Sequence, residues 1–182
     1  VGTGLSNYEI TYTKKTLTVG TKALEVLAVN QSKEYGSLYG GTGFTTVGLA
    51  NSDGVTSANI TSTGSVATAA VGSYDILISN AVGTGLSNYE ITYTKKTLTV
   101  GQKALEVLAV NQSKEYGSLY VGTGFTTVGL ANSDGVTSAT ITSTGSVATS
   151  AVVSYDILIS NAVGTGCWNY GLTYINTTLT TT

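Results

Sequence analysis

The residues of this chain that could carry out acid, base or nucleophilic chemistry are few and scattered. The chain has no histidine and only one cysteine. A Ser or Cys nucleophile needs an adjacent base, usually histidine, and nothing in the sequence places a lysine beside a serine. Paired carboxylates are the other route to acid–base catalysis, but those of this chain belong to separate predicted elements. They are Glu9, Glu25, Glu34, Asp53, Asp75 and their copies further along the chain. We therefore do not expect an enzyme.

The segment NSDGVTS at 51–57 is the only pattern that suggests a cation site. Asn51 and Asp53 could offer the oxygen ligands that Ca²⁺ prefers, but a calcium loop usually has more carboxylates at alternating positions. A turn at Asp53-Gly54 is the simpler interpretation. The segments GGTG and VGTG lack the lysine and the strand–loop–helix context of a phosphate-binding loop, so they are also predicted to be turns. We expect no metal and no cofactor.

Aromatic side chains are the remaining candidates for binding. Trp168, Tyr39 and Tyr120 could stack on sugar rings or anchor a protein contact. Trp168 follows Cys167 where the other copies of the same segment have Leu-Ser, so this pair could equally fill a different terminal core. Cys167 has no partner for an internal disulfide, which leaves an intermolecular disulfide or a small, partly buried side chain.

Composition excludes two classes of partner. The net charge is −2 and the eight lysines are scattered, so the chain has no basic stripe for nucleic acid. Its longest clear apolar stretch, ALEVLAV, has the length of a strand, which argues against membrane insertion. The first segment lacks the basic start and apolar centre of a signal peptide, so a signal for export would have to lie outside this sequence.

The chain is a tandem array with a period of 81 residues. VGTGLSNYEITYT begins at Val1, recurs unchanged at Val82, and returns as VGTGCWNYGLTYI at Val163. Residues 1–81 and 82–162 differ at five positions: Thr21/Gln102, Gly40/Val121, Asn59/Thr140, Ala69/Ser150 and Gly72/Val153. In phase with its elements, the array predicts domains at 21–101 and 102–182. Residues 1–20 are then the closing hairpin of a preceding repeat.

That hairpin is predicted from alternating apolar residues. In NYEITYTKKTLTV the parity of the alternation changes midway, and a two-residue turn at Lys14-Lys15 would return all apolar side chains to one face. An isolated hairpin with an apolar face is marginal in water and should dock on a sheet. The residues of this candidate assembly hairpin are Tyr8, Ile10, Tyr12, Leu17 and Val19.

The remainder of each period also has strand character. ALEVLAV at 23–29 is apolar on both faces and is predicted to be a central strand, and VTSANITST and GSYDILISN predict two more. A single helical turn is expected between Thr45 and Ala50, and no segment has the period of a long helix. The fold class is therefore mostly β, with tandem small domains and at most a short helical turn in each.

Several segments together resemble a known family. NQSKEYGSLY at 30–39 and 111–120, followed by GFTTVGLANSDGVTS, GSYDILISNAVGTGLSNYEITYT and KTLTV, is similar to the MBG domains of the YGX type. These are Mub-B2-like modules that occur in tandem in large bacterial surface adhesins and filamentous-haemagglutinin-like proteins. The Tyr-Gly-X signature falls on Tyr35-Gly36-Ser37 and Tyr116-Gly117-Ser118. The chain departs from the family pattern at Lys14-Lys15, commonly Asn-Gly, and in its altered final segment.

The resemblance implies a small β-rich fold, β-grasp-like or β-sandwich-like, without catalytic residues. It also implies a secreted bacterial protein at the cell surface. We expect a structural or adhesive repeat whose partner is another copy or a longer parent chain, forming a stalk or fibre. One version has the hairpin at 1–20 polymerise the protein by strand complementation. The alternative is a module that binds surface glycans or mucins.

Overall fold

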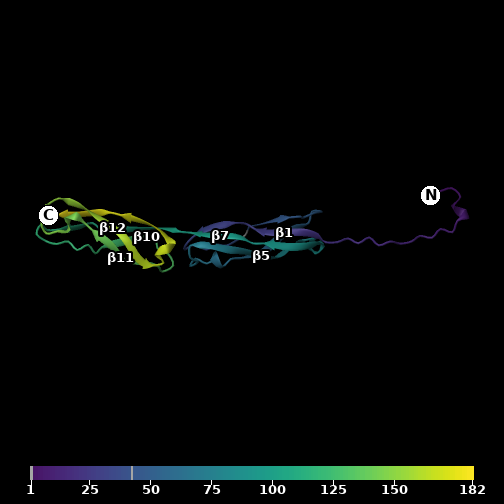
Figure 1. The fold of residues 1–182 in the computed structure, drawn as a ribbon, viewed down its shortest axis with the longest axis horizontal. Coiled ribbons are helices and arrows are strands. Elements are labelled where there is room, and N and C mark those ends of the chain that lie inside the picture. The colour runs from purple at the N-terminus through teal and green to yellow at the C-terminus, as the bar shows by residue number, and fades with distance from the viewer. Residues whose placement is uncertain (1, 42) are drawn as a thin grey trace.

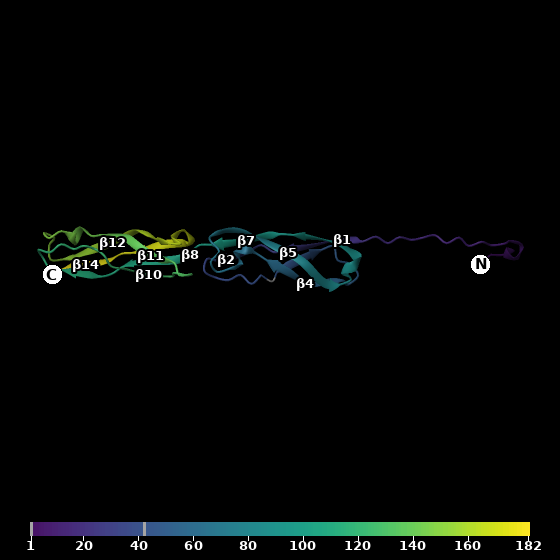
Figure 2. The ribbon, with the colours of Figure 1, turned by 90° about the horizontal axis from the view of Figure 1, so that it is seen from below.

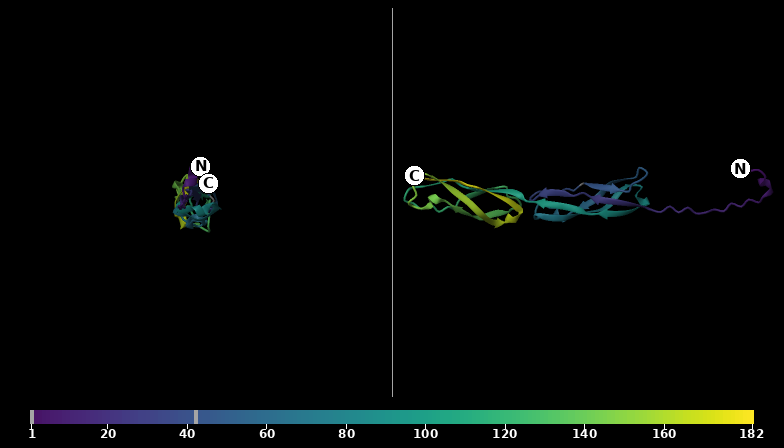
Figure 3. Two further views of the ribbon diagram at one scale, coloured as in Figure 1. Left: turned by 90° about the vertical axis from the view of Figure 1, so that its right-hand side faces the viewer. Right: turned by 45° about the horizontal axis from the view of Figure 1, so that its top comes forward.

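The chain forms a long, thin rod of two repeats placed end to end, with an extended segment at its N-terminal end (Figures 1 and 2). The computed structural model describes residues 2–41 and 43–182. The N- and C-termini lie at opposite ends of the rod, and an end-on view shows how narrow it is (Figure 3). No helix in the described residues is long and apolar enough to cross a membrane.

Each repeat contains seven strands and two three-residue 3₁₀ turns. The strands of the first repeat are β1 (Lys22–Ala28), β2 (Gln31–Glu34), β3 (Phe44–Val47), β4 (Gly54–Thr61), β5 (Gly72–Thr84), β6 (Tyr89–Thr94) and β7 (Lys96–Gly101), with turns η2 (Thr63–Ser65) and η3 (Leu86–Asn88). Those of the second are β8 (Lys103–Ala109), β9 (Gln112–Lys114), β10 (Phe125–Val128), β11 (Gly135–Thr142), β12 (Ser154–Thr165), β13 (Tyr170–Ile175) and β14 (Thr177–Thr181), with turns η4 (Thr144–Ser146) and η5 (Cys167–Asn169).

The strands of each repeat form two sheets. In the first repeat one sheet has the order β3-β1-β6 and the other β2-β7-β5-β4, and the second repeat has the same arrangement. The predicted mostly β fold with tandem small domains is confirmed, and β1 is the central strand expected for ALEVLAV. Two sheets that share one core correspond to the sandwich-like alternative.

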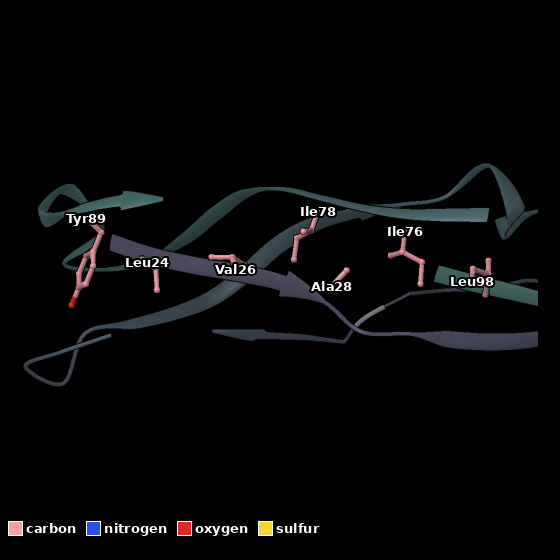
Figure 4. Packing of buried hydrophobic residues seen from close by; sticks show 7 residues of the cluster. All are labelled: Leu24, Val26, Ala28, Ile76, Ile78, Tyr89 and Leu98. Carbon is pink, nitrogen blue, oxygen red and sulfur yellow. The ribbon is translucent and has the colours of Figure 1, made fainter. Parts of the chain in front are cut away.

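The core lies between the two sheets because alternate side chains of their strands point inward. Leu24 and Val26 of β1 and Leu98 of β7 have no exposed surface. Figure 4 shows these side chains in a row along the repeat, with Tyr89 at one end of it. The full buried cluster is Leu24, Val26, Ala28, Ile76, Ile78, Tyr89 and Leu98.

The predicted pairing of the closing hairpin is wrong. In the first repeat, β6 pairs in parallel with β1, whereas β7 pairs in parallel with β2 and antiparallel with β5. The segments on either side of Lys95 therefore belong to different sheets and do not pair with each other. The change of parity has another cause: when a chain passes from one sheet to the facing sheet, the inward direction reverses. A turn at Lys14-Lys15 was the wrong explanation for that reversal.

Two local predictions are also wrong. The single helical turn expected between Thr45 and Ala50 is replaced by β3, which pairs with β1. The turn expected at Asp53-Gly54 lies instead at Asn51 and Ser52, whose φ angles of 54° and 64° are left-handed. Asp53 closes this turn by donating its backbone N–H to the Ala50 carbonyl at 2.9 Å.

Residues 2–21 contain no strand, although their sequence repeats that of β6 and β7. The only regular element is η1 (Leu5–Asn7), a 3₁₀ turn that the local sequence also forms in the repeats. The side chains of the candidate assembly hairpin point into solvent: Tyr8 is 73% exposed, Ile10 45%, Tyr12 88%, Leu17 87% and Val19 86%. The equivalents of Leu17 and Val19 in β7, Leu98 and Val100, are at most 1% exposed. The apolar side chains of the β7 sequence are thus buried inside a repeat and exposed here.

Candidate functional site: the joint between the two repeats

The polar contacts that cross from one repeat to the other centre on Tyr35 of the Tyr-Gly-X signature. Tyr35 follows β2 at the end of the first repeat, and only 5% of its surface is exposed. Its hydroxyl donates to Asp134 Oδ2 of the second repeat at 2.8 Å. Its ring contacts Tyr170 edge-on, with centroids 5.4 Å apart and planes at 81°. This is the favourable T-shaped arrangement of two aromatic rings.

The second repeat receives Tyr35 in a surface that we call the acceptor pocket, formed by Ala131, Asn132, Asp134, Asn169 and Tyr170. The Tyr170 hydroxyl donates to Asp134 Oδ2 at 2.8 Å and accepts from the Ala131 N–H at 2.9 Å. The position of the Asp134 carboxylate also requires a glycine at the end of the VGTG segment, because a Cβ at Gly166 would lie 2.4 Å from Asp134 Oδ1. The absence of a side chain there leaves room for the carboxylate.

Gly36, the second residue of the signature, is required by the joint for two reasons. Its φ of 85° is left-handed, a conformation that glycine adopts without steric cost. A Cβ on Gly36 would also lie 2.7 Å from the Ala131 Cβ of the second repeat. A side chain at this position would therefore push the two repeats apart.

Two asparagines of the acceptor pocket complete the contact. Asn132 Nδ2 donates to the Ala67 carbonyl at 2.9 Å, and that carbonyl also accepts from the Gly36 N–H at 3.1 Å. Asn169 Oδ1 accepts from the Val71 N–H at 3.0 Å. Asn169 is 3% exposed, so its amide is largely removed from water by the joint. Two loops of the first repeat, the one after β2 and the one between η2 and β5, are thereby held to the second.

Apolar packing continues across the joint. Tyr35, Ala69 and Val100 of the first repeat belong to the same buried cluster as the core of the second. The connection between the repeats is short, since β7 ends at Gly101 and β8 begins at Lys103. Gln102 alone links the two strands, and its Nε2 donates to the Trp168 carbonyl at 3.3 Å. Such a junction leaves little freedom for bending.

Burial and the carboxylate raise the pKa of the tyrosines at the joint. Burial is the main cause for Tyr170, whose pKa rises to about 12, and the charge of Asp134 adds to the effect. For Tyr35, the hydrogen bond with Asn132 lowers the pKa, but burial and Asp134 outweigh it and the pKa is raised. Both phenols therefore remain protonated, and able to donate, well above neutral pH.

The two ends of the described pair of repeats each carry one half of the same joint. At the far end of the second repeat, Tyr116 is the equivalent of Tyr35 and is 62% exposed. Gly117 there has a φ of 91°, and no atom lies within 4 Å of a Cβ built on it. At the near end of the first repeat, the equivalent acceptor pocket comprises Ala50, Asn51, Asp53, Asn88 and Tyr89.

The carboxylates do not come together elsewhere. Asp53 accepts from the Tyr89 hydroxyl at 2.9 Å, and Asp75 forms an exposed ion pair with Lys95 at 2.7 Å. Glu25 accepts a hydrogen bond from Thr94. In the part of the chain that the structure describes, no group of three or more His, Cys, Asp and Glu side chains could hold a metal. The carboxylate of the NSDG segment, Asp53, thus accepts a hydrogen bond from Tyr89.

The predicted surface-binding aromatics lie on different elements and do not form one surface. Trp168 is the middle residue of η5 at the rim of the joint and is 70% exposed. Tyr39 is half-buried against the first core, and Tyr120 is half-buried with its pKa raised by burial. Cys167 is a free, partly buried cysteine at the start of η5.

Sequence reasoning identified the Tyr-Gly-X residues as a family marker but not as an interface. The available signal was the invariance of Tyr, Gly, Asp and Asn between two copies that otherwise tolerate change. It could not be used, because near-identical copies share almost every residue. Only the contrast between a buried Tyr35 and an exposed Tyr116 reveals the contact.

Comparison with known proteins agrees with this architecture. A family model described as MBG domain (YGX type) matches twice, at residues 24–99 and 105–180. Neither the search of curated proteins nor that of solved structures finds a match. The two matched segments cover most of the chain and coincide with the two sandwich-like repeats. The chain therefore belongs to the MBG domain family of the YGX type, as two tandem copies.

Proposed function

We propose that this chain is a structural and adhesive repeat of a bacterial cell-surface stalk or fibre. MBG domains occur in surface proteins, and the family is one of structural, adhesin-like repeats rather than of enzymes. The observation that carries the proposal is the joint: a buried tyrosine, a carboxylate and two asparagines hold consecutive repeats in line across a one-residue linker. A rigid spacer needs this kind of contact between units.

Residues 2–20 have a place in the same proposal, as closing strands for another repeat. Their apolar side chains are exposed, whereas the equivalents of Tyr8, Leu17 and Val19 in β6 and β7 are buried. Both described repeats already contain their own closing strands, so neither has a vacant position for this segment. Strand complementation between copies would therefore require displacement of β13 and β14 in the receiving copy.

Electron microscopy of the purified chain, with and without residues 1–19, tests both parts. Straight two-repeat rods of constant length support the rigid spacer, whereas repeats joined at variable angles contradict it. Filaments that disappear on truncation support strand complementation. If discrete rods form in both samples, the segment serves a repeat of the same polypeptide and does not link copies.

Glycan binding is a second candidate, and Trp168 is the observation that favours it. Its indole is 70% exposed at the rim of the joint, a position at which an aromatic ring can stack on a sugar. Binding on a glycan array that is lost in Trp168→Ala would support this function. An array without hits, or hits that Trp168→Ala leaves unchanged, would eliminate it.

A further inference from the structure

The two ends of the rod are complementary, and the observed joint shows how they fit. We propose that the Tyr116-Gly117 loop at the end of the second repeat binds the acceptor pocket of the first repeat in a second copy of this chain, head to tail. The inference rests on the proposed structural function and extends it, because it names the partner and the contacting residues.

The acceptor pocket of the first repeat is already formed without an occupant. The Ala50 N–H donates to the Tyr89 hydroxyl at 2.8 Å, as Ala131 does to Tyr170 at 2.9 Å. Tyr89 donates to Asp53 at 2.9 Å. Asn51 has the same φ of 54° as its equivalent in the occupied pocket. Binding would therefore require no rearrangement of these hydrogen-bonded side chains, which keeps its cost low.

The pocket also has room for a loop. A cavity of about 460 Å³ lies between Asp53, Asn88 and Tyr89, which are equivalent to residues that hold the first repeat at the internal joint, and residues 19–22, where the N-terminal segment enters the repeat. Asn51 and Asn88 are exposed, so their amides are available to a partner. A ligand that brought a phenol and a carbonyl would find the same hydrogen-bonding groups as Tyr35 finds.

The loop of the second repeat offers these groups. By equivalence with the internal joint, the Tyr116 hydroxyl would donate to Asp53, and Asn51 would donate to the Ala148 carbonyl. That carbonyl already accepts from the Gly117 N–H at 3.0 Å, as Ala67 does from Gly36. Gly117 has open space beside it, which Ala50 of the second copy would occupy.

Two substitutions weaken this loop relative to that of the first repeat. Ala69 is replaced by Ser150, and Val100 by Thr181. The hydroxyls of Ser150 and Thr181 are buried without a hydrogen-bond partner. We therefore expect the joint between copies to be weaker than the internal one. The internal joint also benefits from its linker, which raises the effective concentration of the two halves to roughly the millimolar range.

Residues 2–18 must lie aside when two copies meet. At the internal joint, the strand that enters the second repeat is β7, the closing strand of the first. In a joint between copies, β14 of the copy that supplies the Tyr116 loop would take the place of β7. The N-terminal segment of the copy that supplies the pocket therefore has to bend away from this place. The described part of this segment forms backbone hydrogen bonds only within itself, Asn7 to Gly4 and Tyr8 to Leu5, so bending breaks none with the repeats.

Sedimentation velocity of the full chain, up to millimolar concentration, measures the association. Two variants each remove one half of the joint: Tyr116→Ala removes the donated phenol, and Ala50→Phe fills the pocket. Tyr116 is largely exposed and the Ala50 backbone bonds do not involve its side chain, so thermal unfolding should show both variants folded. Leu119→Ala is the matched control, since Leu119 is equally exposed, at 73%, in the same loop.

We expect the wild type and Leu119→Ala to associate with rising concentration. Tyr116→Ala should associate about tenfold to a hundredfold more weakly, as expected for loss of one charge-assisted hydrogen bond, and Ala50→Phe should weaken association at least as much because its ring occupies the pocket. Mixing the two variants should restore a dimer, because one intact loop and one intact pocket remain. Absence of association in the wild type, or association that neither variant weakens, overturns the proposal.

A third variant separates this proposal from strand complementation. Leu17→Asp places a charge on a side chain that is 87% exposed here but whose equivalent Leu98 is fully buried. It should abolish complementation and leave the head-to-tail joint intact. Association lost in Leu17→Asp but kept in Tyr116→Ala would refute the loop-and-pocket contact and support complementation.

Discussion

Tyr35 and Tyr116 occupy the same position in two nearly identical repeats, and only Tyr35 has a partner. Comparison of Tyr35→Ala with Tyr116→Ala therefore isolates the contribution of the joint. Exposure of this side chain is 62% without a partner and 5% with one, so the joint covers 57% of it. With about 200 Å² for a buried aromatic residue, this is roughly 110 Å², or about 3 kcal/mol.

The hydrogen bond from Tyr35 to Asp134 adds to this value. Bonds to a charged group contribute about 1.5–3 kcal/mol. Asp134 keeps its second donor, Tyr170, in the Tyr35→Ala variant, so the carboxylate is not left without a partner. We therefore expect Tyr35→Ala to cost about 4.5–6 kcal/mol of coupling between the repeats. Tyr116→Ala should stay within about 1 kcal/mol of wild type, as is usual for an exposed substitution.

Scanning calorimetry and small-angle X-ray scattering measure the two consequences. If the repeats unfold together, Tyr35→Ala should lower the melting temperature by about 9–24 °C, given about 2–4 °C per kcal/mol for a unit of this size. The maximum dimension should become variable as the rod bends at the joint. Equal effects of the two substitutions would refute the reasoning, since the tyrosine would then act within its own repeat.

Three further predictions follow from the same geometry. Gly36→Ala should destabilise the chain more than Gly117→Ala in denaturant titrations: both introduce strain of about 1–2 kcal/mol at a left-handed φ, but only the first clashes with the neighbouring Ala131. The pKa of Tyr170 is raised to about 12, from about 10 in the unfolded chain. The stability that this shift contributes is therefore complete below pH 10 and is lost as the pH rises from 10 to 12. Tyrosinate absorbance should increase and the melting temperature should fall over the same pH range. Thr181→Val should raise the thermal stability of the second repeat by about 1–2 kcal/mol, because it removes a buried hydroxyl without a partner.

The local alternation of residues was enough to predict most strands. The segment ALEVLAV was predicted to be a central strand because it is apolar on both faces, and β1 does lie in the centre of its sheet. Alternation cannot tell which strands pair, however. The parity change around Lys95 is compatible with a tight turn or with a crossing between facing sheets. The choice depends on contacts with β1 and β2, more than 60 positions away in the chain.

The joint could not be predicted for a similar reason. Tyr35 and Asp134 are 99 positions apart, and each also occurs in a copy where this contact is absent. Exposure, rather than residue type, distinguishes a joined tyrosine from a free one. The exposed N-terminal segment shows the same effect. Leu17 and Leu98 have identical neighbours in the sequence, yet Leu17 is exposed and Leu98 is fully buried. Such differences arise from tertiary context, which no local pattern encodes.

A repeat that carries a loop at one end and the matching pocket at the other can only propagate in one direction. Contacts of this kind are heterologous, and unless the rotation between units closes a ring they extend without limit. Here the axis of each repeat continues into the next, as the straight rod shows (Figure 1). The Tyr-Gly-X signature is then explained without any ligand, since Tyr supplies the bond to the next unit's carboxylate and Gly permits the close approach.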